Sequence, residues 1–226
     1  MQIDIQYRPA NAAAHVVLQP GETVTAEGGA MISMSTNVTI ETTTIQRGKG
    51  GILSGIKRLL GGENFFLNHF TAQQQPGEIW LSAGLPGDMV VRQMDGMALI
   101  IQSGSFVASE QGVSIDASFQ GFGKAIFSGE SMFWLRATGQ GQIILNSFGA
   151  IYPIHVAGEY IVDTGHIVAY DESLEFNIVK AGKSLIGSFL GGEGLVCKFR
   201  GTGTVWCQSH NDKGFGQALG PLLKPV

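Results

Sequence analysis

The sequence predicts an all-β protein built from three copies of one strand pattern, and three observations lead to this prediction. Glycine makes up 33 of the 226 residues, roughly twice its usual share of about 7%. Short segments rich in β-branched and aromatic residues lie between these glycines, which is typical of strands joined by tight turns. Four such segments recur in the same order three times, and a repeat of this kind is very unlikely to arise by chance.

The repeat defines the expected domain organisation. The first segment runs from a glycine to an apolar residue 11 positions later, at 29–40, 104–115 and 165–176. The second lies at 61–67, 128–134 and 191–197, and the third at 77–81, 141–145 and 203–207. The fourth precedes the first, at 20–24, 86–90 and 158–161. We expect one domain of three repeats, residues 1–83, 84–150 and 151–210, with a C-terminal tail at 211–226.

A Gly-Glu pair opens the second segment of each repeat. The residues are Gly62 and Glu63, Gly129 and Glu130, and Gly192 and Glu193. Glycine suits a turn that needs a positive φ, where another side chain would clash. We expect each Glu to accept hydrogen bonds from backbone N–H groups of its turn or of a short helix end. As an alternative, the three carboxylates converge on a pseudo-threefold axis and hold a cation.

Apolar, glycine-interrupted insertions separate the first and second segments. In the first repeat the apolar residues have the i, i+1, i+4, i+7, i+8 spacing of a short helix. The candidate interaction residues are Ile52, Leu53, Ile56, Leu59, Leu60, Phe122, Ile126, Phe127, Leu185, Ile186, Phe189 and Leu190. The insertions either cover the open end of each repeat as a lid or expose an apolar hook for a protein or membrane partner.

Charge and composition bound the classes of function. Only 14% of the residues are charged, against about 25% in an average globular protein. We therefore expect part of the outer surface to be apolar and covered by self-association, a partner or a membrane. A net charge of −4 and a pI near 5.7 predict no nucleic-acid binding. The sequence has neither a signal peptide nor an apolar run of the roughly 20 residues that a membrane span needs, so we expect a soluble, cytoplasmic protein.

Cys197 and Cys207 lie symmetrically about a Gly-Thr-Gly sequence at 201–203. If these three residues form a hairpin turn, the two cysteines lie opposite each other and a disulfide is sterically conceivable. We favour two buried thiols, because the cytosol keeps thiols reduced.

No motif in the sequence predicts catalysis or metal binding. The five histidines lack the spacing that places two imidazoles on one metal ion. Nucleophile-elbow, phosphate-loop and dinucleotide motifs are absent at strand–helix junctions. Ser147, His155 and Asp163 offer the residue types of a hydrolase triad, but their spacing predicts nothing. We predict no catalytic, cofactor-binding or metal-binding residues and no cofactor.

Three stretches of the sequence, 26–31, 61–66 and 86–88, resemble the uncharacterised family related to the mitochondrial biogenesis (altered inheritance of mitochondria) protein. The similarity extends from about Gln2 to His210. It implies a fold like that of the tryptophan RNA-binding attenuator protein, with a β-sandwich unit present three times in pseudo-threefold arrangement and short helical insertions. It implies no reaction, cofactor or catalytic residue. This sequence carries no transit peptide, so we expect a bacterial relative.

Three functions remain as hypotheses. The first is a non-enzymatic scaffold that forms a homo-oligomer and contacts a protein or membrane-surface partner through the apolar insertions. The second is binding of a small ligand or an ion at the junction of the three repeats. The third is a hydrolase with a reactive Ser or Cys, which no motif supports.

Overall fold

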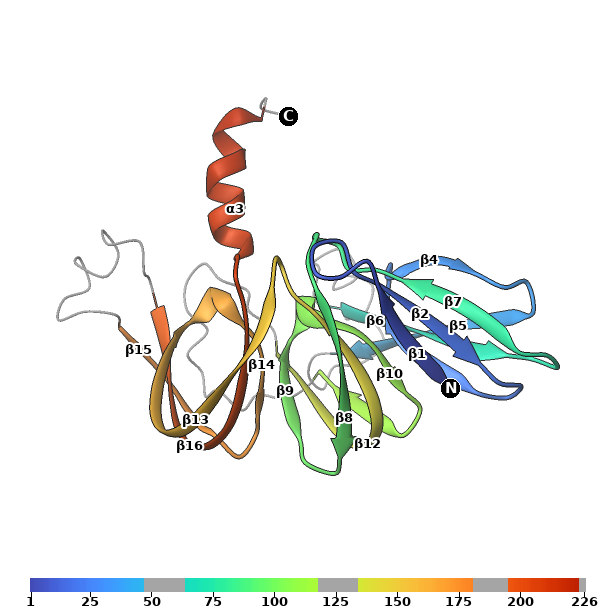
Figure 1. Cartoon of the computed structure of the whole chain (residues 1–226), viewed down its shortest axis with the longest axis horizontal. Coiled ribbons are helices and arrows are strands. Elements are labelled where there is room, and N and C mark those ends of the chain that lie inside the picture. The colour runs from blue at the N-terminus through green and yellow to red at the C-terminus, as the bar shows by residue number, and fades with distance from the viewer. Residues whose placement is uncertain (47–63, 118–133, 181–194, 224–226) are drawn as a thin grey trace.

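The computed structural model describes residues 1–46, 64–117, 134–180 and 195–223. These residues form mostly antiparallel β-sheet with one short α-helix, so the prediction of a mostly β chain is confirmed. Figure 1 shows the strands in three groups that follow one another along the long axis of the molecule.

The strand groups follow the order of the chain. The first group contains β1 (Gln2–Gln6), β2 (Ala13–Leu18), β3 (Thr23–Glu27), β4 (Met31–Met34), β5 (Val38–Gln46), β6 (Asn64–Ala72) and β7 (Gly77–Leu81). The second contains β8 (Met89–Asp95), β9 (Leu99–Gln102), the short 3-10 helix η1 (Ser103–Ser105), β10 (Phe106–Glu110), β11 (Val113–Asp116) and β12 (Trp134–Asn146). The third contains β13 (Ile151–Asp163), the 3-10 helix η2 (Thr164–His166), β14 (Ile167–Asp171), β15 (Glu175–Lys180) and β16 (Leu195–Gln208).

The buried side chains form three cores, each drawn mainly from one strand group and completed by side chains of a neighbouring group, such as Val107 and Ile144 in the first core. In the first group, β1, β2, β7 and β4 form one sheet, while β3, β6 and β5 belong to a second. Alternate residues of these strands point inward, such as Val24 and Ala26 of β3, because successive side chains of a strand face opposite sides of the sheet. Phe70 at the centre of this core is fully buried, and burial of such a side chain stabilises the fold by roughly 1.5–3 kcal/mol.

The pairing of one strand in each group follows the same register. β4 pairs with β7, β10 with β12 and β14 with β16, all antiparallel. In each pair the register shifts by one residue after the first contact. The pairs before and after the shift are Met31↔Leu81 and Ser33↔Trp80, Phe106↔Leu145 and Ala108↔Ile144, and Ile167↔Cys207 and Ala169↔Trp206. The extra residue is a β-bulge, which bends the strand.

Two strand pairings join neighbouring groups. β3 of the first group pairs with β10 of the second, and β9 of the second pairs with β14 of the third. A continuous sheet therefore runs from group to group. Among the strands that the structure describes, β4 pairs only with β7 and β13 only with β16. Strand pairing within the described residues thus links the groups in a row and does not close them into a ring.

Two long strands differ from the segmentation expected from the repeat. In the second and third groups the second and third segments merge into the single strands β12 and β16. Gly139 and Gly201 have positive φ angles of 109° and 121°, so the chain bends there without leaving the sheet. In the first group the longer connection 73–76 separates β6 from β7, and it contains Pro76, which has no N–H to donate.

Residues 201–203 lie inside the single strand β16. They therefore do not form the hairpin turn that would place the two cysteines opposite each other. Cys197 and Cys207 lie on the same strand, and Cys197 faces Val162 while Cys207 faces Tyr152 across the β13–β16 pairing. Both thiols are free and buried, as we favoured. Burial raises the pKa of the Cys207 thiol to about 12 and that of Cys197 further still, because a thiolate is poorly solvated in the core.

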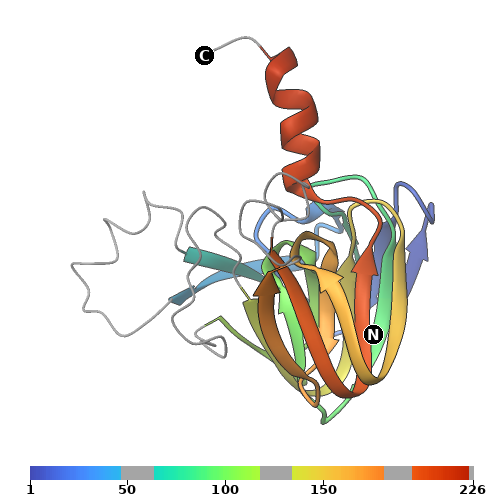
Figure 2. The same ribbon diagram turned by 90° about the vertical axis from the view of Figure 1, so that its left-hand side faces the viewer.

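The C-terminal tail contains a helix that the sequence reading missed. Helix α3 (Asp212–Leu219) is followed by η3 (Gly220–Leu222), and Figure 2 shows α3 standing clear of the strands. Asn211 caps the helix, since its side-chain oxygen accepts a hydrogen bond from the Gly214 N–H at 2.6 Å. Gly214 and Gly216 within the helix weaken the sequence signal, because each interior glycine costs about 1 kcal/mol relative to alanine.

Candidate functional site

The connection between the first and second groups crosses close against the connection between the second and third. Gly87 and Gly149 form a parallel bridge. The Asp88 N–H donates to the Gly149 carbonyl at 2.9 Å, and the Ser147 N–H donates to the Asp88 carbonyl at 3.0 Å. A Cβ atom on Gly87 would overlap the Ser147 carbonyl oxygen. Glycine is required at position 87 because two backbones meet there, even though its φ angle is ordinary.

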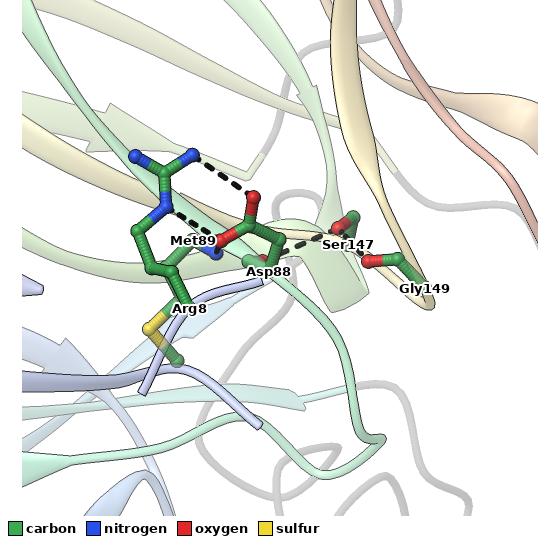
Figure 3. Close-up of polar contacts among 5 residues, drawn as sticks. All are labelled: Arg8, Asp88, Met89, Ser147 and Gly149. Carbon is green, nitrogen blue, oxygen red and sulfur yellow. Dashed lines mark hydrogen bonds and ion pairs between the residues drawn. The ribbon is translucent and has the colours of Figure 1, made fainter. Parts of the chain in front are cut away.

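An ion pair fixes this crossing to the N-terminal segment. The Arg8 guanidinium donates to both carboxylate oxygens of Asp88, at 2.7 and 2.9 Å, and the Met89 N–H donates to the same carboxylate at 2.8 Å. Figure 3 shows the two side chains facing each other, with Ser147 and Gly149 beside them. Asp88 is buried, so the paired Arg8 offsets the cost of a charge away from water. The hydrogen bond to Asp88 also raises the pKa of Arg8.

Arginine–carboxylate pairs also join the second and third groups. Arg92 of β8 donates to Asp171 of β14 at 2.6 Å, and its guanidinium lies 4.1 Å from the centre of the Trp206 ring. Arg136 of β12 donates to both oxygens of Glu172, at 2.7 Å each. The bidentate geometry of the Arg136–Glu172 contact fixes orientation as well as charge.

Two small cavities open at the crossing. The first has a volume of about 270 Å³ and is lined by the residues of the crossing together with Asn11, Ser82 and Asn146. The second, of about 210 Å³, shares Asn146 and collects polar side chains from all three groups and from α3. These side chains are Glu27, Gln102, Gln208 and Asp212.

Glu27 is the unusual ionisable group of the second cavity. Burial raises the pKa of its carboxyl to about 7, because a carboxylate loses solvation when it leaves water. Gln208 is held in place, since its side chain accepts from the Phe148 N–H at 2.8 Å and donates to the Gly165 carbonyl at 3.0 Å. The cavity thus offers a carboxyl that is half-protonated near neutral pH and can pair with a cationic group.

The hydrolase residue types are not brought together by the structure. The Ser147 hydroxyl donates to the Gly149 carbonyl at 2.7 Å, and His155 contacts the Thr204 hydroxyl at 3.3 Å. Asp163 caps η2 by accepting from the Gly165 N–H at 2.8 Å. Within the described ranges no three His, Cys, Asp or Glu side chains are arranged to hold a metal ion.

The residues singled out from the sequence lie elsewhere in the chain. The twelve apolar residues of the insertions and the six Gly-Glu turn residues all fall outside the described residues. The structure therefore does not test whether the insertions are lids or hooks. The sequence did not predict Arg8, Asp88, Glu27 and Gln102 as candidate site residues. Glu27 and Gln102 each stand two positions before the glycine that begins the first segment of their repeat, and that correspondence is a signal that could have drawn attention to both.

A family model described as mitochondrial biogenesis AIM24 matches residues 3–210. The chain belongs to the AIM24 family. An uncharacterized protein of Streptococcus pyogenes serotype M6 is 29% identical over 207 residues, which cover 89% of this chain and 83% of that relative. A crystal structure of a protein from Streptococcus pyogenes superposes with a TM-score of 0.79 at 25% identity, covering 98% of this chain and 99% of the other.

These comparisons confirm the family resemblance seen in the sequence, and the match ends at the last residue before the helical tail of this AIM24 chain. The structure adds one finding on membranes. None of the helices in the described ranges has the length and apolar character needed to cross a bilayer.

The backbone crossing makes a direct prediction for Gly87. Gly87→Ala places a methyl group onto the Ser147 carbonyl, and relieving that overlap is expected to lower the free energy of unfolding by about 2–3 kcal/mol. Urea denaturation measures this loss. Gly84→Ala is the matched control, because a Cβ there meets no atom within 4 Å, and its stability is expected to stay within about 0.5 kcal/mol of wild type. Equal stability of the two variants would contradict the close crossing.

Proposed function

We propose that this AIM24-family chain is a non-enzymatic scaffold that associates with itself and binds a partner through exposed apolar surfaces. The observation that carries the proposal is where its exposed large hydrophobic side chains lie. Of fourteen such side chains in the described residues, three belong to β4, three to β13 and four to the stretch from Phe215 to Leu223. Apolar surface gathered in this way is typical of interaction sites.

The three strand groups are proposed to be copies of one sandwich unit, as in the attenuator-like fold that the sequence suggested. The identical register shifts of β4, β10 and β14 support this. A second correspondence is a hydrogen bond in each group, in which a polar side chain accepts from the backbone N–H of the residue after a repeated glycine. The side chain of Ser35 accepts from the Glu78 N–H, that of Glu110 from the Gln142 N–H and that of Asp171 from the Thr204 N–H, at 2.8–3.0 Å.

The attenuator-like fold does not bring RNA binding with it. The chain has 14 basic and 18 acidic residues, and binding to single strands needs a positively charged groove lined with aromatic side chains. Fold likeness alone carries no function.

The helical tail supplies the surface for a partner other than the chain itself. Phe215 and Leu219 are exposed at i and i+4 of α3, the spacing of one helix face, and Leu222 is exposed in η3 directly after it. The ring of Phe148 meets the ring of Phe215 edge-on, with 5.3 Å between the ring centroids, and anchors the base of the helix. The apolar insertions at 52–60, 122–127 and 185–190 are proposed, from the sequence alone, to extend this contact surface.

The proposal is tested by mass and by membrane binding. In sedimentation equilibrium we expect a mass that is a multiple of 24.0 kDa and rises with concentration, because the exposed apolar side chains are covered by association.

We expect Phe215→Asp with Leu219→Asp to abolish co-sedimentation with lipid vesicles or with a captured protein while leaving self-association intact. Gln217→Asp, which adds charge to the same helix, is the control. Ile56→Glu with Leu185→Glu tests the insertions. A chain that stays monomeric and binds nothing would overturn the scaffold.

A second candidate function is supported by the Glu27 cavity. Two carboxyl groups, Glu27 and Asp212, face a space of about 210 Å³, which suits a small amine or a divalent cation. A thermal-shift screen with primary amines and divalent ions is expected to stabilise the wild type, and Glu27→Gln is expected to remove the effect. If none of these ligands raises the melting temperature, the cavity is not a binding site.

The raised pKa of Glu27 predicts how stability changes with pH. The folded chain holds this proton up to about pH 7, whereas the usual pKa is 4.5. The contribution of the protonated Glu27 carboxyl to the free energy of unfolding is therefore complete below pH 4.5 and is lost as pH rises through 7. Over this window the wild type is expected to lose up to about 3 kcal/mol more than Glu27→Gln, measured by urea unfolding at several pH values. Glu41→Gln, exposed on β5, should behave like wild type. Parallel curves for Glu27→Gln and wild type would contradict the burial of this carboxyl.

A further inference from the structure

Two strand pairings connect neighbouring groups, β3 with β10 and β9 with β14, and each of them is called a joint below. Both joints have the same register. At the first joint Ala26 faces Ala108, Thr25 faces Ser109 and Val24 faces Glu110. At the second joint Ile101 faces Ala169, Ile100 faces Tyr170 and Leu99 faces Asp171. Ala26 and Ile101 each stand three positions before the glycine that begins the first segment of their repeat, Gly29 and Gly104. The joint is thus the same antiparallel pairing made twice.

The third group carries the counterpart of β3 and β9 without a partner for it. Val162 stands three positions before Gly165, so residues 160–162 at the end of β13 correspond to 24–26 and 99–101. On one side these residues pair with β16. On the other side no strand of the described residues pairs with them.

The first group carries the complementary half. Residues 33–35, at the end of β4 and just beyond it, correspond to 108–110 and 169–171, and β4 pairs on one side with β7. Its other side meets no strand among those described. Figure 1 places β4 and β13 at opposite ends of the row of strand groups. Among the described residues, the row of strand groups therefore has one unpaired half of a joint at each end.

Exposure changes sharply between the made and the unmade joints. Ile32 of β4 is 55% exposed, whereas Val107 and Val168 at the corresponding positions are 1% and 0% exposed. Ile161 of β13 is 57% exposed, and its counterpart Ile100 is 1% exposed. The side chains at the open ends are as apolar as those buried at the joints, so they are suited to the same burial.

β4 also lacks the features that keep edge strands apart. Its sequence Met-Ile-Ser-Met contains no charge and no proline, and natural edge strands are commonly protected by lysine, proline or inward-pointing charge. An unprotected edge offers its free N–H and C=O groups to another strand.

We propose that β4 of one copy pairs with the end of β13 of a second copy, in the register of the two internal joints. Ser33 then faces Val162, Met34 faces Ile161 and Ser35 faces Tyr160. The inference rests on the proposed self-association and names its partner, a second copy joined head to tail. Because the two surfaces differ, each copy keeps one free end, so the assembly either closes as a ring or grows as a filament.

Charged substitutions at the two ends test the direction of pairing. Met34→Lys and Ile161→Lys are each expected to give a chain that sediments as a 24.0 kDa monomer. When the two variants are mixed, the intact β13 of the first meets the intact β4 of the second. The mixture is expected to contain a species of twice the chain mass and nothing larger. Ile40→Lys is the control, because Ile40 is an exposed apolar residue on the edge strand β5.

Disulfide trapping tests the register without a charge that could perturb folding. A mixture of Met34→Cys and Ile161→Cys, or of Ser35→Cys and Tyr160→Cys, is expected to form a cross-linked dimer on mild oxidation. Two adjacent pairs are used because the closely spaced and widely spaced pairs of an antiparallel ladder alternate. Ile40→Cys mixed with Ile161→Cys should remain uncross-linked. The native thiols are buried and free.

Each result separates the inference from the proposed function. If the wild type associates but the Lys variants remain associated and no pair cross-links, self-association stands and the β4–β13 joint is wrong. If Met34→Cys cross-links with itself, β4 pairs with β4 and the head-to-tail joint is wrong. If the wild type is monomeric at all concentrations, both the joint and the self-association are overturned.

Discussion

Backbone hydrogen bonding across the joints between strand groups is the constraint on which this structure depends. The three buried cores are small and each takes side chains from a neighbouring group, and a small domain buries only part of the surface that its chain exposes. The β3–β10 and β9–β14 pairings turn three such cores into one molecule. The arginine–carboxylate pairs and the crossing at Gly87 lie at these same joints and fix the angle at which the groups meet.

Close packing inside the strand groups explains why glycine recurs at positions 77 and 203. A Cβ on Gly77 would lie 2.5 Å from Val38, and a Cβ on Gly203 would lie 2.9 Å from Leu174. Val38 and Leu174 occupy the same place in their repeats, so one packing requirement explains two glycines far apart in the sequence. A local requirement of this kind leaves a pattern in the sequence itself, which is why the mostly β character of the chain was predictable.

The features that were not predictable depend on distant parts of the chain. Arg8 and Asp88 are 80 residues apart, and no local pattern links them. The merging of segments into β12 and β16 depends on whether the connecting residues can bend without leaving the sheet. The exposure of β4 is the clearest case. β4, β10 and β14 resemble one another in sequence, but β10 and β14 pair with β3 and β9 of a neighbouring group, whereas within the described residues β4 pairs with β7 alone.

The open ends of the row are the centre of the proposed function, because the apolar surface there corresponds to the surface that the internal joints bury. Hydrogen exchange of the outward-facing amides of β4 and of the end of β13 tests this claim most directly. With rising protein concentration, exchange is expected to slow at both ends together, while the outer edge of β5 keeps a constant rate. Exchange that is independent of concentration at β4 and β13 would contradict the account.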